Sequence, residues 1–169
     1  MKSGSGVTSI QRRRDIPAAT LLFVATAAFV FWQNSQVAIL WDLSYLLDTS
    51  WRIALGQAPY RDFPLVHAPL TFLIQAAIMR LAGRHYFLQI AYAALIGGLS
   101  SVIGWRIVFR VLREAHSAWL IAVLLAAPLV FLGVYSVYPH PIYDCDCALC
   151  LLVAIFMLQS LGTAETRQF

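Results

Sequence analysis

Charged side chains are scarce in this 169-residue chain, in which aspartate, glutamate, lysine and arginine together make up 12% of the residues. Soluble domains carry about 25% charged residues and roughly 45–50% apolar ones. Here the apolar share reaches 60%, and the mean hydropathy is +0.73. The scarcity of charge argues against an ordinary soluble domain and predicts a protein whose helices lie in a membrane.

Two further absences narrow the class of protein. The chain has no basic stretch interleaved with aromatic residues, which argues against nucleic acid as a partner. Cysteine is rare, and the three cysteines fall within a short stretch at the start of an apolar run: Cys145, Cys147 and Cys150. They cannot link distant parts of the fold, so we expect small thiols that pack between helices.

Four apolar runs are long enough to cross a bilayer, which takes about 20 residues of helix. They cover residues 17–37, 86–105, 117–135 and 143–161. A fifth run, Leu70–Ala82, is only about 13 residues long and carries Gln75 and Arg80, so we expect it at the membrane interface. The sequence therefore predicts an all-α polytopic membrane protein with four transmembrane helices. Two interfacial helices are expected in its first outer loop, residues 38–85.

The positive residues predict the orientation of the chain. With four spans and a cytoplasmic N-terminus, eight of the twelve lysines and arginines face the cytoplasm and four face outside. Counting Leu70–Ala82 as a fifth span reverses this bias, so the positive-inside rule favours four spans and two cytoplasmic termini. The expected organisation is a tail of residues 1–15, a membrane module of residues 16–162 and a tail of residues 163–169.

A cleaved signal peptide is the rival interpretation of the N-terminus. Residues 12–14 would form its basic region, and Ala25-Thr26-Ala27 loosely resembles a cleavage site. The apolar run continues through Trp32, however, and is longer than the roughly 7–15 residues of a usual signal sequence. We therefore expect a retained membrane anchor.

The first outer loop begins with an amphipathic pattern over residues 43–55, which predicts a helix lying on the membrane. Asp48 and Arg52 are spaced four residues apart on its polar face and are expected to pair. Gly56 follows as a C-terminal cap. Asp42 stands directly before this helix, at the outer end of the first span. Its spacing alone favours the role of N-cap residue over a role in chemistry.

A longer pattern starts at Asp42. It begins with an acid after the first span, followed by an alanine near the end of a helix and a glycine. A Pro-Tyr-x-Asp-Phe segment comes next, and then a Pro-Leu helix that ends near a glycine. The positions that carry it are Asp42, Ala54, Gly56, Pro59-Tyr60-Arg61-Asp62-Phe63, Pro69-Leu70 and Gly83. This stretch resembles the first outer loop of the GT-C glycosyltransferases. It is closest to the family 39 group of protein mannosyltransferases and aminoarabinose transferases.

The resemblance implies an enzyme of the bacterial inner membrane that passes a sugar from a polyprenyl-phosphate carrier to an acceptor on the outer face. It assigns the role of catalytic base to Asp42, because an outer-face carboxylate can take the proton of an acceptor hydroxyl. Arg61 and His67 are expected to contact either the phosphate of the carrier or lipid headgroups. The remaining substrate-binding candidates are Tyr60, Asp62, His140, Tyr143 and Asp144.

The second outer loop ends in Tyr143-Asp144, which matches a Tyr-Asp segment that often opens the fourth span in this family. A divalent metal bound by His140, Asp144, Asp146 and the cysteines is an alternative use of this loop. No spacing here matches a recognised zinc framework, however. The sequence predicts no other cofactor.

Enzymes of this family are several times longer than this chain. The chain is therefore expected to be the opening part of such an enzyme, a truncated product, or a half-enzyme that needs a partner chain for the C-terminal part. The competing class is a non-catalytic four-helix membrane subunit that keeps the transferase scaffold.

Overall fold

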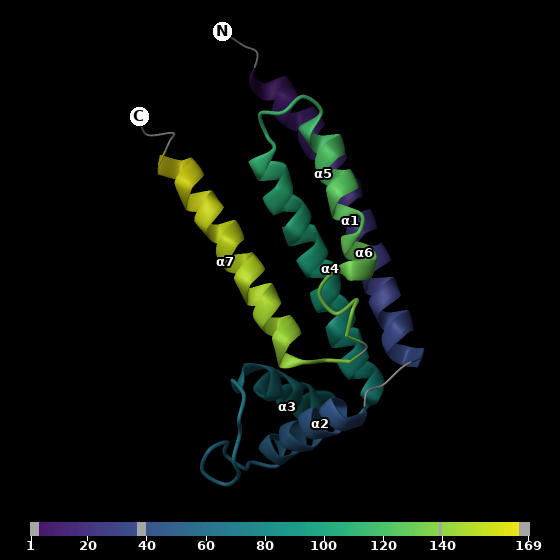
Figure 1. Ribbon diagram of the computed structural model, residues 1–169, viewed down its shortest axis with the longest axis vertical. Coiled ribbons are helices and arrows are strands. Elements are labelled where there is room, and N and C mark those ends of the chain that lie inside the picture. The colour runs from purple at the N-terminus through teal and green to yellow at the C-terminus, as the bar shows by residue number, and fades with distance from the viewer. Residues whose placement is uncertain (1–3, 37–39, 139, 166–169) are drawn as a thin grey trace.

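The structure, a computed structural model, describes residues 4–36, 40–138 and 140–165, and these residues form helices without any strand. The helices are α1 (Gly4–Gln36), α2 (Leu40–Ala54), α3 (Leu70–Ala82), α4 (Tyr86–Val111), α5 (Ala118–Ala126), α6 (Leu129–Leu132) and α7 (Tyr143–Glu165). Figure 1 shows α1, α4, α5 and α7 running along the long axis, while α2 and α3 lie across one end of the bundle. The all-α prediction is confirmed for the described residues.

Three helices are long and apolar enough to cross a membrane: Arg14–Gln36 within α1, Tyr86–Val111 (α4), and Tyr143–Leu161 within α7. They correspond to the first, second and fourth predicted spans, and they make the chain consistent with a membrane protein. Their positions follow directly from the runs of apolar sequence.

The third predicted span, residues 117–135, is interrupted. Its apolar part, Ala118–Leu132, is shorter than a span and is divided between α5 and α6. Pro128 lies at the break, because proline has no N–H to bond to the preceding turn and its ring crowds that turn. Tyr135 then takes a positive φ of 65° as the chain turns towards α7. Helix length therefore does not confirm the count of four spans.

α1 and α4 form the most extensive helix pair in the bundle. Their close approach depends on glycines in α4: a Cβ at Gly98 would lie 2.7 Å from the ring of Phe23, and one at Gly97 would lie 3.0 Å from the backbone oxygen of Val134. No larger residue fits these contacts without a shift of the neighbouring atoms. Packing through small residues is typical of helices in membranes.

α2, α3 and the loop of residues 55–69 form a unit that we call the platform. The two helices pack against each other across the end of the bundle (Figure 1), and they share a core with loop residues: Leu46, Phe63, Leu65 and Phe72. α3 has the bounds that the sequence predicts, whereas α2 begins earlier, at Leu40. Asp42 therefore lies inside the first turn of α2, so the N-cap interpretation does not fit the described helix.

The opposite end of the bundle is joined by polar contacts. The Asp15 carboxylate of α1 pairs with Arg106 of α4 at 2.8 Å and accepts a hydrogen bond from the Trp119 indole of α5 at 3.2 Å. Arg110 of α4 donates to the backbone oxygen of Phe156 in α7 at 2.8 Å. The start of α1 and the end of α7 both lie at this end (Figure 1).

Candidate functional site

Four aromatic rings meet where the platform touches the start of α7. His67 of the platform loop stacks on Tyr143 of α7, with ring centroids 3.9 Å apart and an interplanar angle of 24°. Tyr45 of α2 lies edge-on to His67 at 5.9 Å and to Phe72 of α3 at 5.7 Å. We call Tyr45, His67, Phe72 and Tyr143 the aromatic cluster. It brings the platform together with the start of α7, which lies far from the platform in the sequence.

Two exposed carboxylates border the aromatic cluster. Asp42 lies in the first turn of α2 and Asp144 in the first turn of α7, and both are close enough for their charges to act on Tyr143. Within the described part of the chain, neither carboxylate belongs to an ion pair. Acidic side chains in the first turn of a helix interact favourably with the helix dipole.

His140 is fully buried next to this site, and neither of its ring nitrogens has a hydrogen-bond partner among the described residues. Burial lowers the pKa of His140 below its ordinary value of 6.5, and the nearby Asp42 carboxylate offsets part of that effect. The imidazole is therefore neutral at pH 7, with one nitrogen able to accept a proton.

This coupling between Asp42 and His140 gives a testable pH dependence. We expect the variant Asp42→Asn to lower the pKa of His140 further, because the asparagine no longer stabilises the imidazolium. A histidine with a depressed folded pKa is neutral in the fold, so the stability that it contributes is present above pH 6.5 and is lost as the pH falls below it. Titration of ring-labelled histidine by NMR measures the shift, with exposed His85 and His116 as internal references. A higher pKa of His140 in the variant would contradict the coupling.

Beneath the aromatic cluster, a buried carboxylate joins the platform to α7. Asp146, which is 4% exposed, accepts hydrogen bonds from the Thr71 hydroxyl of α3 at 2.6 Å and from the Tyr135 hydroxyl at 2.8 Å. Tyr135 is itself buried and bonded to the backbone of Ile142, just before α7. This Asp146 network fixes the register of α7 against α3.

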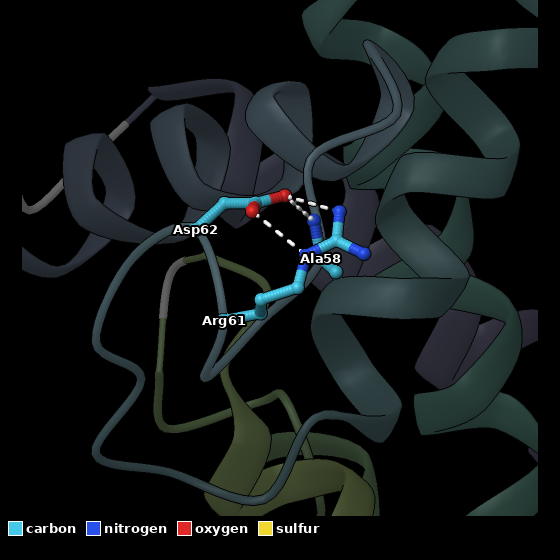
Figure 2. A network of polar contacts seen from close by, with 3 residues as sticks. All are labelled: Ala58, Arg61 and Asp62. Carbon is cyan, nitrogen blue, oxygen red and sulfur yellow. Dashed lines mark hydrogen bonds and ion pairs between the residues drawn. The ribbon is translucent and has the colours of Figure 1, made fainter.

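The Pro-Tyr-Arg-Asp turn of the platform loop is held mainly by its own residues (Figure 2). The Asp62 carboxylate binds Arg61 at 2.8 and 2.9 Å and accepts the Ala58 N–H at 2.7 Å. The Arg61 guanidinium is the main cause that lowers the pKa of Asp62 to about 2, followed by the Ala58 N–H. The same pairing raises the pKa of Arg61. Tyr60 connects the turn to the site by donating its hydroxyl to the His67 carbonyl at 3.0 Å.

The sequence-predicted site residues thus divide into two groups. Asp42, His67, His140, Tyr143 and Asp144 come together at the aromatic cluster, with Tyr60 one hydrogen bond away. Arg61 and Asp62 satisfy each other at the turn, so a role for Arg61 at a phosphate stays a prediction.

Sequence reasoning missed Tyr45 and Phe72 of the cluster and the role of Asp146. The only available signal for Asp146 was an acid within an apolar run, which is costly in a membrane helix unless it has partners.

The described residues contain no group of three or more histidine, cysteine or acidic side chains that could hold a metal ion. Asp146, one member of the alternative metal set, is engaged by hydroxyl groups instead. The three cysteines carry free thiols, with Cys145 buried and the other two exposed. The geometry gives no support to the metal alternative.

Comparison with protein-family models, curated proteins and solved structures finds no match to this chain. The resemblance to the GT-C glycosyltransferases therefore stays a prediction from residues of the two outer loops.

Proposed function

We propose that the chain crosses the membrane four times and that the platform lies at one membrane surface. Three crossings are the helices of sufficient length described above. Connectivity supports the fourth: α4 ends at Val111 away from the platform and α7 begins at Tyr143 beside it, so residues 112–142 must return along the bundle. Ala118–Leu132 supplies the apolar part of that return.

The exposed surface of α3 supports an interfacial position for the platform. Leu70, Leu73 and Leu81 project from α3 with about half or more of their surface uncovered. An interfacial helix buries such residues among the lipid tails next to the headgroups. The positive-inside bias places the platform outside the cytoplasm and both ends of the described chain on the cytoplasmic side.

Thiol labelling in intact cells tests this topology. In a background with the three native cysteines replaced by alanine, Tyr60→Cys should react with a membrane-impermeant maleimide, whereas Arg113→Cys should react only after permeabilisation. Both positions are exposed and lie at opposite ends of the bundle. The reverse pattern would overturn the orientation, and equal labelling of the two positions would overturn the four crossings.

We further propose that the platform carries a site for transfer of a sugar from a polyprenyl-phosphate donor. The observation that carries this proposal is convergence: Asp42 and His67 of the first outer loop meet Tyr143 of the second, although the two loops are separated by α4, α5 and α6. The resemblance alone named these residues as members of one site. Their meeting in space is an independent point in its favour.

The chemistry follows from the side chains at this point. Aromatic faces such as those of His67 and Tyr143 offer an apolar surface for the C–H face of a sugar ring. Asp42 takes the proton of the acceptor hydroxyl while the hydroxyl oxygen forms a bond to the anomeric carbon. The bond between the anomeric carbon and the phosphate oxygen breaks, and polyprenyl phosphate leaves with the electron pair. A cationic or hydrogen-bonding group is needed at that phosphate, and Arg61 and His67 of the platform loop are the candidates that the resemblance names.

A transfer assay in reconstituted vesicles tests the proposal. The chain is inserted alone, and in parallel with a candidate partner chain, into vesicles that contain a radiolabelled polyprenyl-phosphate sugar. Transfer of label to an acceptor, or its release to water, is measured with time. Loss of the carrier-bound label only in vesicles that contain the chain supports a catalytic role. No loss in either preparation would refute it.

A non-catalytic membrane subunit is the second candidate function. One observation favours it: only 11% of the most apolar window of α7 is buried, which leaves a long apolar face for the helices of a partner or for lipid. Under this alternative the chain raises the yield or activity of a partner enzyme, and that effect is unchanged by Asp42→Asn.

A further inference from the structure

A groove opens on the side of the bundle between α1 and α5, far from the aromatic cluster. It encloses about 670 Å³ and is lined by apolar side chains with one exception, Arg14 at its end. Six of its lining residues define it here: Arg14, Leu21, Ala25, Trp105, Trp119 and Val130. We call it the α1–α5 groove. Its volume lies in the range of sites that hold small organic ligands.

The length of the groove matches one leaflet of a bilayer. Along α1 it extends from Arg14 to Ala25, which at 1.5 Å per residue is roughly 16 Å. Half of the bilayer hydrocarbon is about 15 Å. The groove therefore runs from the end of the bundle opposite the platform to about the middle of the apolar zone, as a single lipid chain does.

The charge at the groove's end is positive, and no described carboxylate pairs with it. Asp15, the neighbouring acid, is engaged by Arg106 at 2.8 Å and by the indole of Trp119 at 3.2 Å. Arg14 is exposed, and the described residues offer it no ion-pair partner. A guanidinium at the mouth of an apolar groove suits a ligand with an anionic phosphate joined to a hydrocarbon chain.

We propose that the α1–α5 groove binds an anionic phospholipid of the leaflet that Arg14 faces, with one acyl chain between α1 and α5 and the phosphate on Arg14. This proposal requires the chain to lie in a membrane but does not depend on sugar transfer. A zwitterionic phospholipid has the same acyl chains, but its headgroup carries no net charge. The preference for an anionic lipid therefore rests on the attraction between its headgroup and Arg14. One basic residue near an anionic lipid surface raises the affinity of a protein for that surface by about fivefold.

Tryptophan quenching by lipids with brominated chains tests this site. The other tryptophans, Trp32, Trp41 and Trp51, are replaced by phenylalanine, so that Trp105 and Trp119 at the groove report the emission. We expect brominated phosphatidylglycerol, diluted in unbrominated phosphatidylcholine, to quench at about fivefold lower mole fraction than brominated phosphatidylcholine diluted in the same way. Ala25→Phe, which fills the inner part of the groove, should weaken quenching by both lipids.

Arginine variants separate a specific site from ordinary lipid contact. Arg14→Gln should abolish the preference for phosphatidylglycerol, Arg14→Lys should keep part of it, and Arg113→Gln, at an exposed arginine of the same end, should leave it unchanged. Circular dichroism confirms that each variant is folded. Equal quenching by the two lipids in the parent protein would overturn the proposal. So would native mass spectrometry showing a second copy of the chain, or a polyprenyl phosphate, bound in place of phospholipid.

Discussion

Replacing Asp42 by asparagine is expected to lower the rate of sugar transfer by roughly 10²–10⁴-fold, because asparagine cannot take the proton of the attacking hydroxyl. The helix should tolerate the change, since Asp42 is exposed in the first turn of α2. Besides its coupling to His140, the substitution removes the interaction of the carboxylate with the helix dipole, worth about 0.3–1 kcal/mol. Turnover of the polyprenyl-phosphate sugar in vesicles measures the effect, with expression and membrane insertion followed in parallel.

Asp48→Asn is the matched control for this experiment. Asp48 lies on the same helix and pairs with Arg52 at 2.9 Å, but both side chains are largely exposed. Exposed pairs contribute little to stability, so transfer should remain near the parent rate. If Asp42→Asn also retained near-normal turnover, Asp42 would be a residue of the helix terminus and not the base.

Truncation of Asp146 to alanine is expected to cost the largest amount of stability, about 2–4 kcal/mol. The Thr71 hydroxyl would lose its acceptor in a buried place, and the Tyr135 hydroxyl would keep only the Ile142 carbonyl. An unsatisfied buried group costs roughly 1–3 kcal/mol, and a lost hydrogen bond roughly 0.5–1.5 kcal/mol. Asp146→Asn should lose less, because an amide still offers an oxygen acceptor and can donate to a rotated hydroxyl. Denaturant unfolding in mixed micelles, followed by tryptophan emission, gives the difference in free energy.

Asp144→Ala provides the comparison for Asp146. Asp144 is two residues earlier on α7 and exposed, so its removal should change the free energy of unfolding by no more than about 0.5 kcal/mol. Limited proteolysis of the platform loop adds a local readout, since Asp146→Ala should make cleavage there faster. Equal stability of the two alanine variants would contradict a structural role for the Asp146 network.

The elements that could be predicted from the sequence are those whose signal is local. The apolar runs fix α1, α4 and α7, and the short amphipathic stretches fix α2 and α3, since each pattern is contained within one helix. The third span shows the limit of this reasoning. Hydropathy counts residues 117–135 as one run, whereas the backbone breaks at Pro128 and turns again at Tyr135.

The site was only partly predictable, because its members come from separate segments. The resemblance named Asp42, His67 and Tyr143, but no pattern in the sequence relates the ring of His67 to that of Tyr143. Thr71 and Asp146 are 75 residues apart, and only the packing of α3 on α7 makes them partners. Arg61 pairs with the adjacent Asp62 while its side chain stays 74% exposed, so its expected contact with a phosphate stays a prediction. Two opposite charges that are adjacent in the sequence do not by themselves predict a binding site, since the two side chains can pair with each other in a turn or contact a ligand.

The attachment of α7 to the platform has a mechanical consequence. Tyr143 stacks on His67, and three residues further along the same helix Asp146 holds Thr71. A transmembrane helix adjusts its tilt to the thickness of the bilayer around it, and a change in the tilt of α7 therefore moves both attachment points together. Because Asp42 belongs to the same platform, we expect lipid chain length to change how the platform lies on the membrane surface while the separation of Tyr143 from Asp42 is kept.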